Sequence, residues 1–500
     1  DYLGIDRSLV THVEARDLNP TWGNRRLLKE IAESGCSARL IPAFAVSPSC
    51  YYEKGVLDFL KANFSSGKVR AIRIFPEVSR FPVLLLERIF AELAKYEPVV
   101  VWDCRAGSDN DIRDFTALAG KFPQMSFIFA QKMWGGFGSL IDAMWRQKNI
   151  YVDISWLHMR DTANLIIDEF GAERVLFGIG YKSHYGAAVA ALAHYQIAEK
   201  QRGLIAHGNI ERLLKIKPLK KKLSEAPELL QRKPLWQTCR NGLPLQGVKV
   251  IDAHGHTGPT HRGWYIRDIE FPEYADILVA QMDRLGIEKT VISAETALFG
   301  DAVEGNHYAE KQLMKYSNRI AGYLSFNPLY GKELAAEMDG FFKRGYYIGF
   351  KILAAYWRIP FTDSRYDVVW KYADKYRLPI LLHTWDGEPP LLKDIVKKYP
   401  NANFLLGHSG GGTRGRLEAE ELALANPNVY LEFCGSFTTP RPFELSMKIV
   451  GNDRVIFGSD TGAHDQAWEL GRYLSMPVPD KQLIPGLGLN FEKILARTKK

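Results

Sequence analysis

Two histidines separated by a single glycine, His254 and His256, are placed by their spacing to act together. A mostly apolar run, residues 248–251, precedes them, and Gly258 and Pro259 follow. This pattern predicts a short buried strand that ends in a loop. Alternate side chains of a strand share a face, so we expect both imidazoles to point the same way. Two imidazoles held close together form half of a transition-metal site, although two surface histidines at a strand end would give the same pattern.

Four more polar side chains directly follow short apolar runs in the same half of the chain: Lys351, His383, His408 and Asp460. A histidine that is hydrogen-bonded inside the core is the common explanation for any one such residue. That explanation does not extend easily to four histidines and one aspartate that all stand at the ends of predicted strands. Imidazole and carboxylate are ligands that zinc accepts, so the set favours a shared metal site.

The elements that must position these residues are eight predicted strands in the second half of the chain. Amphipathic helical patterns separate them, which indicates parallel βα units. Eight such units in about 250 residues fit a (β/α)8 barrel, whose active site lies at the carboxyl ends of the strands. An open doubly wound sheet is the alternative, but no glycine-rich phosphate loop follows the first strand. The predicted strands are 249–253, 289–294, 320–326, 347–353, 379–383, 403–407, 429–433 and 455–459.

The first half of the chain repeats the order of the second at an offset of about 280 residues, which indicates one domain-sized duplication. The run Gly-x-x-Arg-Val-x-Phe-Gly occurs at 171–178 and again at 451–458. Asp1 aligns with Asp283, so the first half lacks the strand and helix that carry the paired histidines in the second. We therefore expect an α/β protein of two tandem TIM-type barrels, the first without its first βα unit. We also expect that the natural chain extends upstream, or that the first barrel is completed by other means.

The repeat divides the chain into a first barrel at residues 1–215, a linker at 216–247 and a second barrel at 248–500. The linker is basic and contains prolines, and we expect it to hold one short helix. The first barrel has lost the polar residues of the second. In place of Lys351, His383, His408 and Asp460 it has Arg73, Trp102, Gln131 and Gly180.

Glutamine is a poor zinc ligand, and tryptophan and glycine offer no ligand atom. The first barrel is therefore expected to be a non-catalytic copy. We expect it to pair with the second barrel as a partner subunit would. The alternative is two independent barrels on a flexible linker.

Composition excludes several other classes of protein. The 500 residues are 46% hydrophobic and 24% charged, which are ordinary values for a soluble globular protein. No apolar run reaches the length of a membrane span. The formal net charge is +8, but apart from residues 215–222 the basic side chains are spread along the chain, so we expect neither a nucleic-acid nor a membrane partner. Five cysteines without a C-x-x-C pair favour free thiols and a cytoplasmic location.

The second half resembles the amidohydrolase superfamily, specifically its amidohydrolase-related group of metal-dependent (β/α)8 enzymes. The resemblance covers residues 248–495 and rests on four motifs in order: H-x-H, the histidine after strand five, G-H-x-G-G after strand six and G-S-D after strand eight. It implies one divalent metal, zinc or another such as manganese, and it implies that His408 lies beside a metal-bound water. The implied metal ligands are His254, His256, His383 and Asp460.

The chemistry of such a site follows from its residue types. The metal lowers the pKa of water towards neutrality and polarises a carbonyl, and Asp460 or His408 could take the proton and return it to the leaving group. Lys351 either pairs with a substrate carboxylate, which we favour, or bridges two metals in a carbamylated form. Residues in predicted loops on the same rim could line a pocket for an anionic aromatic molecule, although packing or solvated roles are equally open: Trp357, Arg358, Trp385 and Arg414.

We therefore predict a metal-dependent hydrolase that acts on a C–N or C–O bond of a small, carboxylate-bearing substrate. The two-barrel chain could form a homo-oligomer. A non-oxidative decarboxylase of an unsaturated or aromatic acid is the alternative enzyme, because it would use the same ligands on another substrate. A non-catalytic binding or scaffold protein is the alternative class, and the intact ligand set argues against it.

Overall fold

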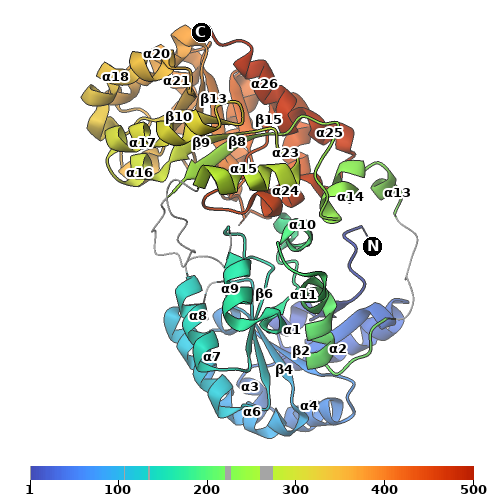
Figure 1. Cartoon of the computed structure of the whole chain (residues 1–500). Coiled ribbons are helices and arrows are strands. Elements are labelled where there is room, and N and C mark those ends of the chain that lie inside the picture. Colours follow the sequence, from blue (N-terminus) through green and yellow to red (C-terminus); the bar gives the residue numbers. More distant parts are fainter. Residues whose placement is uncertain are drawn as a thin grey trace. The chain divides into compact units, whose positions relative to one another are not determined.

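Each half of the chain forms a parallel β-sheet of its own in a computed structural model of the protein (Figure 1). The structure describes residues 2–105, 107–132, 136–160, 162–219, 227–258, 274–437 and 439–499. Within these described ranges the first sheet has seven strands and the second has eight, and in both the spatial order follows the order along the chain. Parallel neighbours joined by helices are the arrangement of TIM-type barrels. The predicted tandem barrels are therefore confirmed, including the missing strand of the first.

The strands of the second barrel lie close to their predicted positions. Hydrogen bonds close this barrel at the end that carries the polar side chains, because Ala253 N donates to Phe457 O (3.0 Å) and Asp460 N donates to His254 O (2.6 Å). The strands are β8 (Ile251–Thr257), β9 (Lys289–Ala294), β10 (Ile320–Ser325), β11 (Tyr347–Ile352), β12 (Pro379–His383), β13 (Asn403–Gly407), β14 (Val429–Glu432) and β15 (Val455–Ile456).

Helices lie outside the strands of the second barrel, as Figure 1 shows for the segments coloured yellow to red. Their amphipathic faces bury apolar side chains against the sheet. The main ones are α15 (Tyr274–Leu285), α17 (Ala302–Lys315), α18 (Gly331–Lys343), α20 (Asp367–Tyr376), α21 (Lys393–Lys398), α22 (Thr413–Ala425), α23 (Phe443–Val450) and α24 (Gln466–Leu474).

The first barrel has the same alternation without the first unit. Its strands are β1 (Ser8–Val10), β2 (Leu40–Ala45), β3 (Ala71–Ile74), β4 (Val99–Asp103), β5 (Ser126–Ala130), β6 (Ile150–Asp153) and β7 (Val175–Leu176). Its main helices are α2 (Pro20–Glu33), α4 (Val56–Ser65), α6 (Glu87–Leu93), α7 (Asp109–Lys121), α8 (Phe137–Arg146) and α9 (Thr162–Phe170). None of the helices in the described ranges is both long and apolar enough to cross a membrane.

The repeated sequence run has the same structural role in both barrels. The guanidinium of Arg174 donates to Ile150 O at 2.7 Å, and that of Arg454 donates to Val429 O at 3.1 Å. Each arginine thereby joins the last strand of its barrel to the strand before it. The repeated run therefore has the same function in both halves, which is to attach the last strand of the barrel to its neighbour.

The terminal helix of each repeat covers the end of its barrel that lies opposite the polar side chains. In the second barrel, Phe491 and Ile494 of α26 (Asn490–Leu495) belong to the buried cluster formed by inward-facing strand residues such as Leu381 and Leu405. In the first barrel, α12 (Asn209–Leu213) packs against the corresponding cluster. The opposite ends of the strands are left for polar side chains.

Contacts between residues divide the molecule into two compact units. One unit contains residues 2–180 and 195–219, and the other contains Tyr181–His194 and the described residues from Glu228 onward. Helix α10 (Ala187–His194), which belongs to the first repeat in sequence, packs on α24 of the second barrel. The segment predicted as a linker contributes two helices to the second unit, α13 (Glu228–Gln231) and α14 (Pro234–Arg240).

Candidate metal and active site

His254 and His256 lie on β8 itself, which extends to Thr257 and is longer than the sequence predicted. Both imidazoles are buried. Nδ1 of His254 lies 2.9 Å from a carboxylate oxygen of Glu432, and Nδ1 of His256 lies 2.9 Å from the hydroxyl oxygen of Ser293. A histidine that is oriented through one nitrogen presents the other to a metal, and here both Nε2 atoms face Asp460.

Asp460 follows β15 and faces both Nε2 atoms. Its Oδ1 lies 2.8 Å from Nε2 of His256 and 3.5 Å from Nε2 of His254. Burial alone would raise the pKa of Asp460, but the charges of His254 and His464 and the hydrogen bond from His256 hold that pKa well below its ordinary value. The backbone of Asp460 has a φ of 57°. A left-handed conformation is uncommon for residues other than glycine, and such residues cluster at functional sites.

Hydrogen bonds determine which nitrogen of His408 and of His383 carries a proton. Nδ1 of His408 lies 2.7 Å from the carbonyl oxygen of Cys434, which can only accept, so Nδ1 donates. Burial lowers the pKa of His408 to about 4. The ring is therefore neutral, and its Nε2 accepts from Nδ1 of His383 at 3.0 Å. Nε2 of His383 is then an unprotonated nitrogen, and it is buried without a hydrogen-bond partner among the described residues.

Lys351 lies at the end of β11, fully buried, with its Nζ 2.6 Å from Nε2 of His254. Burial lowers the pKa of this amine to about 8. The amine lies inside the cluster of histidines, within reach of either a substrate group or a metal held there. Both interpretations of Lys351 made from the sequence are compatible with this position.

Two groups of side chains in the described part of the chain bring metal-ligating atoms within 4.8 Å of one another. Nε2 of His383, which is buried without a hydrogen-bond partner among the described residues, would extend the group of His254, His256 and Asp460 to three imidazoles and one carboxylate. That donor set fits a divalent metal such as zinc, and neutral imidazole is the form that binds metal. The first group is His254, His256 and Asp460, and the second is His254, His408, Glu432 and Cys434.

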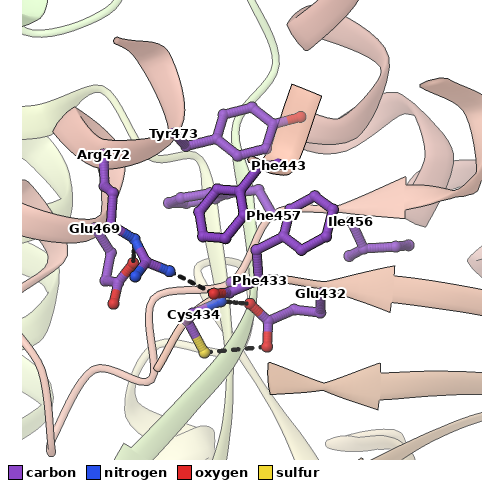
Figure 2. A pocket seen from close by; sticks show the side chains of 10 residues that line it. Glu432, Phe433, Cys434, Phe443, Ile456, Phe457, Glu469, Arg472 and Tyr473 are labelled. Atoms are coloured by element: carbon purple, nitrogen blue, oxygen red, sulfur yellow. Dashed lines mark hydrogen bonds and ion pairs between the residues drawn. The ribbon is translucent and has the colours of Figure 1, made fainter. Parts of the chain in front are cut away.

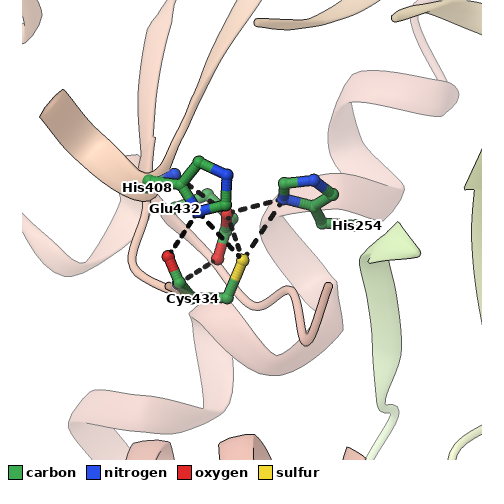
Figure 3. Close-up of side chains that lie close together, drawn as sticks. All are labelled: His254, His408, Glu432 and Cys434. Atoms are coloured by element: carbon green, nitrogen blue, oxygen red, sulfur yellow. Dashed lines mark hydrogen bonds and ion pairs between the residues drawn. The ribbon is translucent and has the colours of Figure 1, made fainter. Parts of the chain in front are cut away.

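The members of the second group are already bonded to one another (Figure 3). Besides its contact with His254, Glu432 accepts from the thiol of Cys434 at 3.0 Å and from the backbone N–H of His408 at 3.3 Å. Burial raises the pKa of Glu432 to about 7. A carboxylate that faces the second nitrogen of a metal-ligating histidine is a common orienting group, and we assign that role to Glu432.

A small cavity lies next to this carboxylate, on the side towards α24 (Figure 2). Its volume is about 10 Å³, the size of a single water. Glu432 and Cys434 line it together with Glu469 and Arg472, whose side chains form an ion pair at 3.0 Å. The back of the site therefore combines paired charges with the apolar side chains of Phe433, Phe443, Ile456 and Phe457.

Aromatic rings form one wall of the cluster. Trp385 stacks on His408 with ring centroids 5.3 Å apart and an interplanar angle of 10°. The rings of Trp385 and Tyr356 both meet His383 edge-on, at 5.0 and 4.9 Å. Trp385, which was predicted to bind substrate, is thus in contact with the site.

The two arginines predicted to bind substrate lie apart from the cluster. Arg358 is exposed and caps the short helix α19 (Ala354–Trp357). Arg414 is exposed and forms an ion pair with Glu418 at 2.7 Å. In the described ranges no hydrogen bond or ion pair joins either arginine to the cluster. The structure therefore brings together the predicted metal ligands with Lys351, His408 and Trp385, and leaves both arginines at the surface.

Three residues of the site were not predicted from the sequence: Glu432, Cys434 and His464. His464 lies 3.8 Å from a carboxylate oxygen of Asp460 and 3.3 Å from one of Glu469. Glu432 lies one residue before the end of the predicted strand 429–433, near the positions of the ligand candidates, and this position was the signal that could have identified it. Cys434 directly follows that strand and belongs to no motif.

In the first barrel, the positions equivalent to His383, His408 and Asp460 hold residues that do not form a metal-binding set. Trp102 is buried against Phe115 and Phe129, with ring centroids 5.2 and 5.7 Å away. Gln131 donates from its amide to Asp103 at 3.0 Å. Gly180 has a φ of 64°, close to that of Asp460. The first repeat thus keeps the left-handed backbone there, but with a residue that adopts it without strain.

A model of the amidohydrolase family, Amidohydro_2, matches the chain twice, at residues 24–216 and 251–499. No curated protein matches the chain. Three solved structures illustrate the similarity at the level of structure. The first is 5-carboxyvanillate decarboxylase from Sphingomonas paucimobilis, with 14% identity and a TM-score of 0.40, covering 51% of this chain and 100% of that one. The second is 5-carboxyvanillate decarboxylase from Novosphingobium aromaticivorans with manganese and 4-hydroxy-3-methoxy-5-nitrobenzoic acid, with 15% identity and a TM-score of 0.40, covering 51% of this chain and 98% of that one. The third is a probable 2-pyrone-4,6-dicarboxylic acid hydrolase from Acinetobacter baumannii with citric acid bound, with 13% identity and a TM-score of 0.40, covering 50% of this chain and 99% of that one.

The two family matches together take in most of the chain and coincide with the two repeats seen in the sequence and in the sheets. Among the residues that the structure describes, only the second repeat brings histidines and an aspartate together at the carboxyl ends of its strands. The chain belongs to the amidohydrolase family.

Proposed function

We propose that the second barrel is a metal-dependent hydrolase that acts on a C–N or C–O bond of a small, carboxylate-bearing molecule. The observation that supports this most directly is the pair of buried imidazoles, His254 and His256, that face Asp460. Nε2 of His383 is buried without a hydrogen-bond partner among the described residues and can join this pair as a ligand. Three imidazoles and one carboxylate are typical of zinc sites with an open position. We therefore propose zinc as the metal, with manganese as the alternative.

In this proposal the metal ligands are His254, His256, His383 and Asp460. A metal bound there lowers the pKa of a water molecule and polarises a carbonyl group. Asp460 stays ionised among the histidines, so its second carboxylate oxygen can hold the proton that leaves the attacking water and can pass it to the leaving group.

His408 has the role of orienting His383, because its Nε2 is already bonded to Nδ1 of that ring. It can also accept a proton if that contact opens when substrate binds. Lys351 lies beside His254, and its amine would pair with a carboxylate of the substrate. In each case the residue reaches the reacting groups from the end of a different strand, as in other TIM-type enzymes.

The aromatic wall supports a second candidate, the non-oxidative decarboxylation of an aromatic or unsaturated acid. Tyr356 and Trp385 lie against His383, and flat side chains at this position suit a flat substrate. Decarboxylation would use the same ligand set, with proton delivery to carbon in place of attack by water.

A substrate screen on the zinc-loaded protein tests the proposal. Lactones, amides and aromatic carboxylates are incubated with the wild-type protein and with Asp460→Asn as the matched control. Hydrolysis that the control lacks supports the first candidate, and release of carbon dioxide supports the second. A protein that binds zinc but turns over none of these compounds would contradict both.

A further inference from the structure

The loop after β14, residues 433–437, holds His408 from one side. The carbonyl of Cys434 accepts from Nδ1 of His408, and Ser436 donates from its hydroxyl to the His408 carbonyl. Gly435 has a φ of 67°, and a Cβ at that position would lie 2.5 Å from Nδ1 of His408. The loop thus fits so closely under the imidazole that a small shift of the loop would change the position of the ring.

The other side of this loop is in contact with residues from the first repeat. Ser183 is buried and donates from its hydroxyl to the carbonyl of Phe437 at 2.9 Å. His184 is fully buried, with its ring 6.0 Å from that of Phe437 and 5.2 Å from that of Trp468. The ring of Phe437 in turn lies 5.1 Å from His464, which neighbours Asp460.

Tyr185 holds the other end of the segment that connects β14 to α23, at the start of α23. Its hydroxyl accepts from the backbone N–H of Phe443 at 3.0 Å and donates to Glu444 at 2.7 Å. The backbone of Tyr185 has a φ of 48°, a conformation that persists only where surrounding contacts enforce it. The next residue, Gly186, donates from its N–H to the hydroxyl of Ser475 at 2.7 Å.

We propose that the segment Tyr181–Gly186, contributed by the first repeat, is a positioning element of the metal site in the second barrel. It holds loop 433–437 against His408. The carbonyl of Cys434 then fixes the tautomer of His408, His408 fixes that of His383, and the unprotonated Nε2 of His383 is directed to the metal. Ser183 and Tyr185 are the positioning residues, since their hydroxyls make the polar contacts.

This inference rests on the proposed metal site, and metal affinity tests it without any substrate. The probe is Zn²⁺ in competition with a chromophoric chelator, applied to full-length wild type, Ser183→Ala, Tyr185→Phe and the double variant. Loss of an outer-sphere partner weakens metal binding by about 10- to 100-fold, so we expect affinity to fall about tenfold in each single variant. Ser183→Thr keeps the hydroxyl and should bind Zn²⁺ as wild type does.

Tyr347→Phe is the matched control, because Tyr347 is buried and its hydroxyl donates to the carbonyl of Asn306 at 2.5 Å, at the opposite end of the strand that carries Lys351. Hydrogen exchange of the amides of residues 433–437 is measured in parallel. Faster exchange and weaker Zn²⁺ binding in Ser183→Ala and Tyr185→Phe, with neither change in Tyr347→Phe, support the inference.

Unchanged Zn²⁺ affinity in both single variants would overturn it, and so would weaker affinity with unchanged exchange of the loop. If the double variant fails to fold, the conservative change Tyr185→Phe decides the question alone. A wild-type protein that binds no Zn²⁺ overturns the proposed metal site itself, together with this inference. A wild type that binds Zn²⁺ as tightly as its variants overturns the inference only.

Discussion

At the scale of single residues, the site depends on hydrogen bonds that orient each imidazole. A backbone carbonyl that can only accept fixes His408, and His408 fixes His383. His254 and His256 are each oriented through Nδ1 by Glu432 and Ser293. The outcome is a set of oriented imidazoles next to one carboxylate, and this set is what makes the proposed metal site chemically reasonable.

Asp460→Asn tests the role given to the carboxylate. Asparagine tolerates the left-handed backbone of this position, so we expect the variant to fold. It cannot accept a proton at neutral pH, and turnover should fall by about 10²-fold or more. Steady-state rates on the substrate found in the screen check this. Retention of more than about a tenth of the wild-type rate would be incompatible with general-base action.

Lys351→Met tests which interpretation of the buried lysine holds. Methionine fills similar space without the charge. If the amine pairs with a substrate carboxylate, the variant should keep its metal and show a KM raised by about 10- to 100-fold. Metal analysis and steady-state kinetics are made on the same preparation. Loss of bound metal would instead favour a lysine that bridges two metals.

At the scale of elements, the sequence predicted almost all strands, because buried parallel strands form short apolar runs between amphipathic helices. It also predicted the ligand candidates, since they stand directly after those runs. Glu432 was missed because a carboxylate that orients a ligand has no motif of its own. The packing of α10 on the second barrel was missed because an apolar helix does not specify which sheet it covers.

The packing of α10 on α24 can be measured with a matched pair of small residues. A Cβ at Gly471 would lie 2.2 Å from Cβ of Ala190, so Gly471→Ala should cost about 1–3 kcal/mol in the free energy of unfolding. Ala190→Gly alone should cost about 1 kcal/mol. Urea denaturation of the double variant should show a smaller loss than the sum of the two. Strict additivity would mean that the two helices do not touch at these positions.

At the scale of the whole molecule, the compact unit that carries the site is larger than the second repeat. It includes Tyr181–His194 from the first repeat and the helices of the connecting segment. Within that segment Lys233 is buried and pairs with Asp480 at 2.9 Å. The boundaries of the sequence repeat therefore differ from those of the compact unit that carries the candidate site.

A fragment of residues 248–500 should therefore be defective. It lacks α10 and α14, and it would expose the side of α24 on which they pack, including Trp468, which is fully buried in the full chain. We expect the fragment to aggregate, or to bind Zn²⁺ more weakly than the full chain. Size-exclusion chromatography and chelator competition show which occurs. A monomeric fragment with wild-type Zn²⁺ affinity would contradict the dependence on the first repeat.

Metal content per chain tests the central claim most directly. The protein is incubated with Zn²⁺, dialysed and measured by elemental analysis, alongside His383→Ala in the second barrel and Gln131→Ala at the equivalent place of His408 in the first. We predict one zinc per chain in the wild type and in Gln131→Ala, and loss of that zinc in His383→Ala. A wild type without zinc, or a His383→Ala variant that retains it, would contradict a single metal site at the ends of the second barrel's strands.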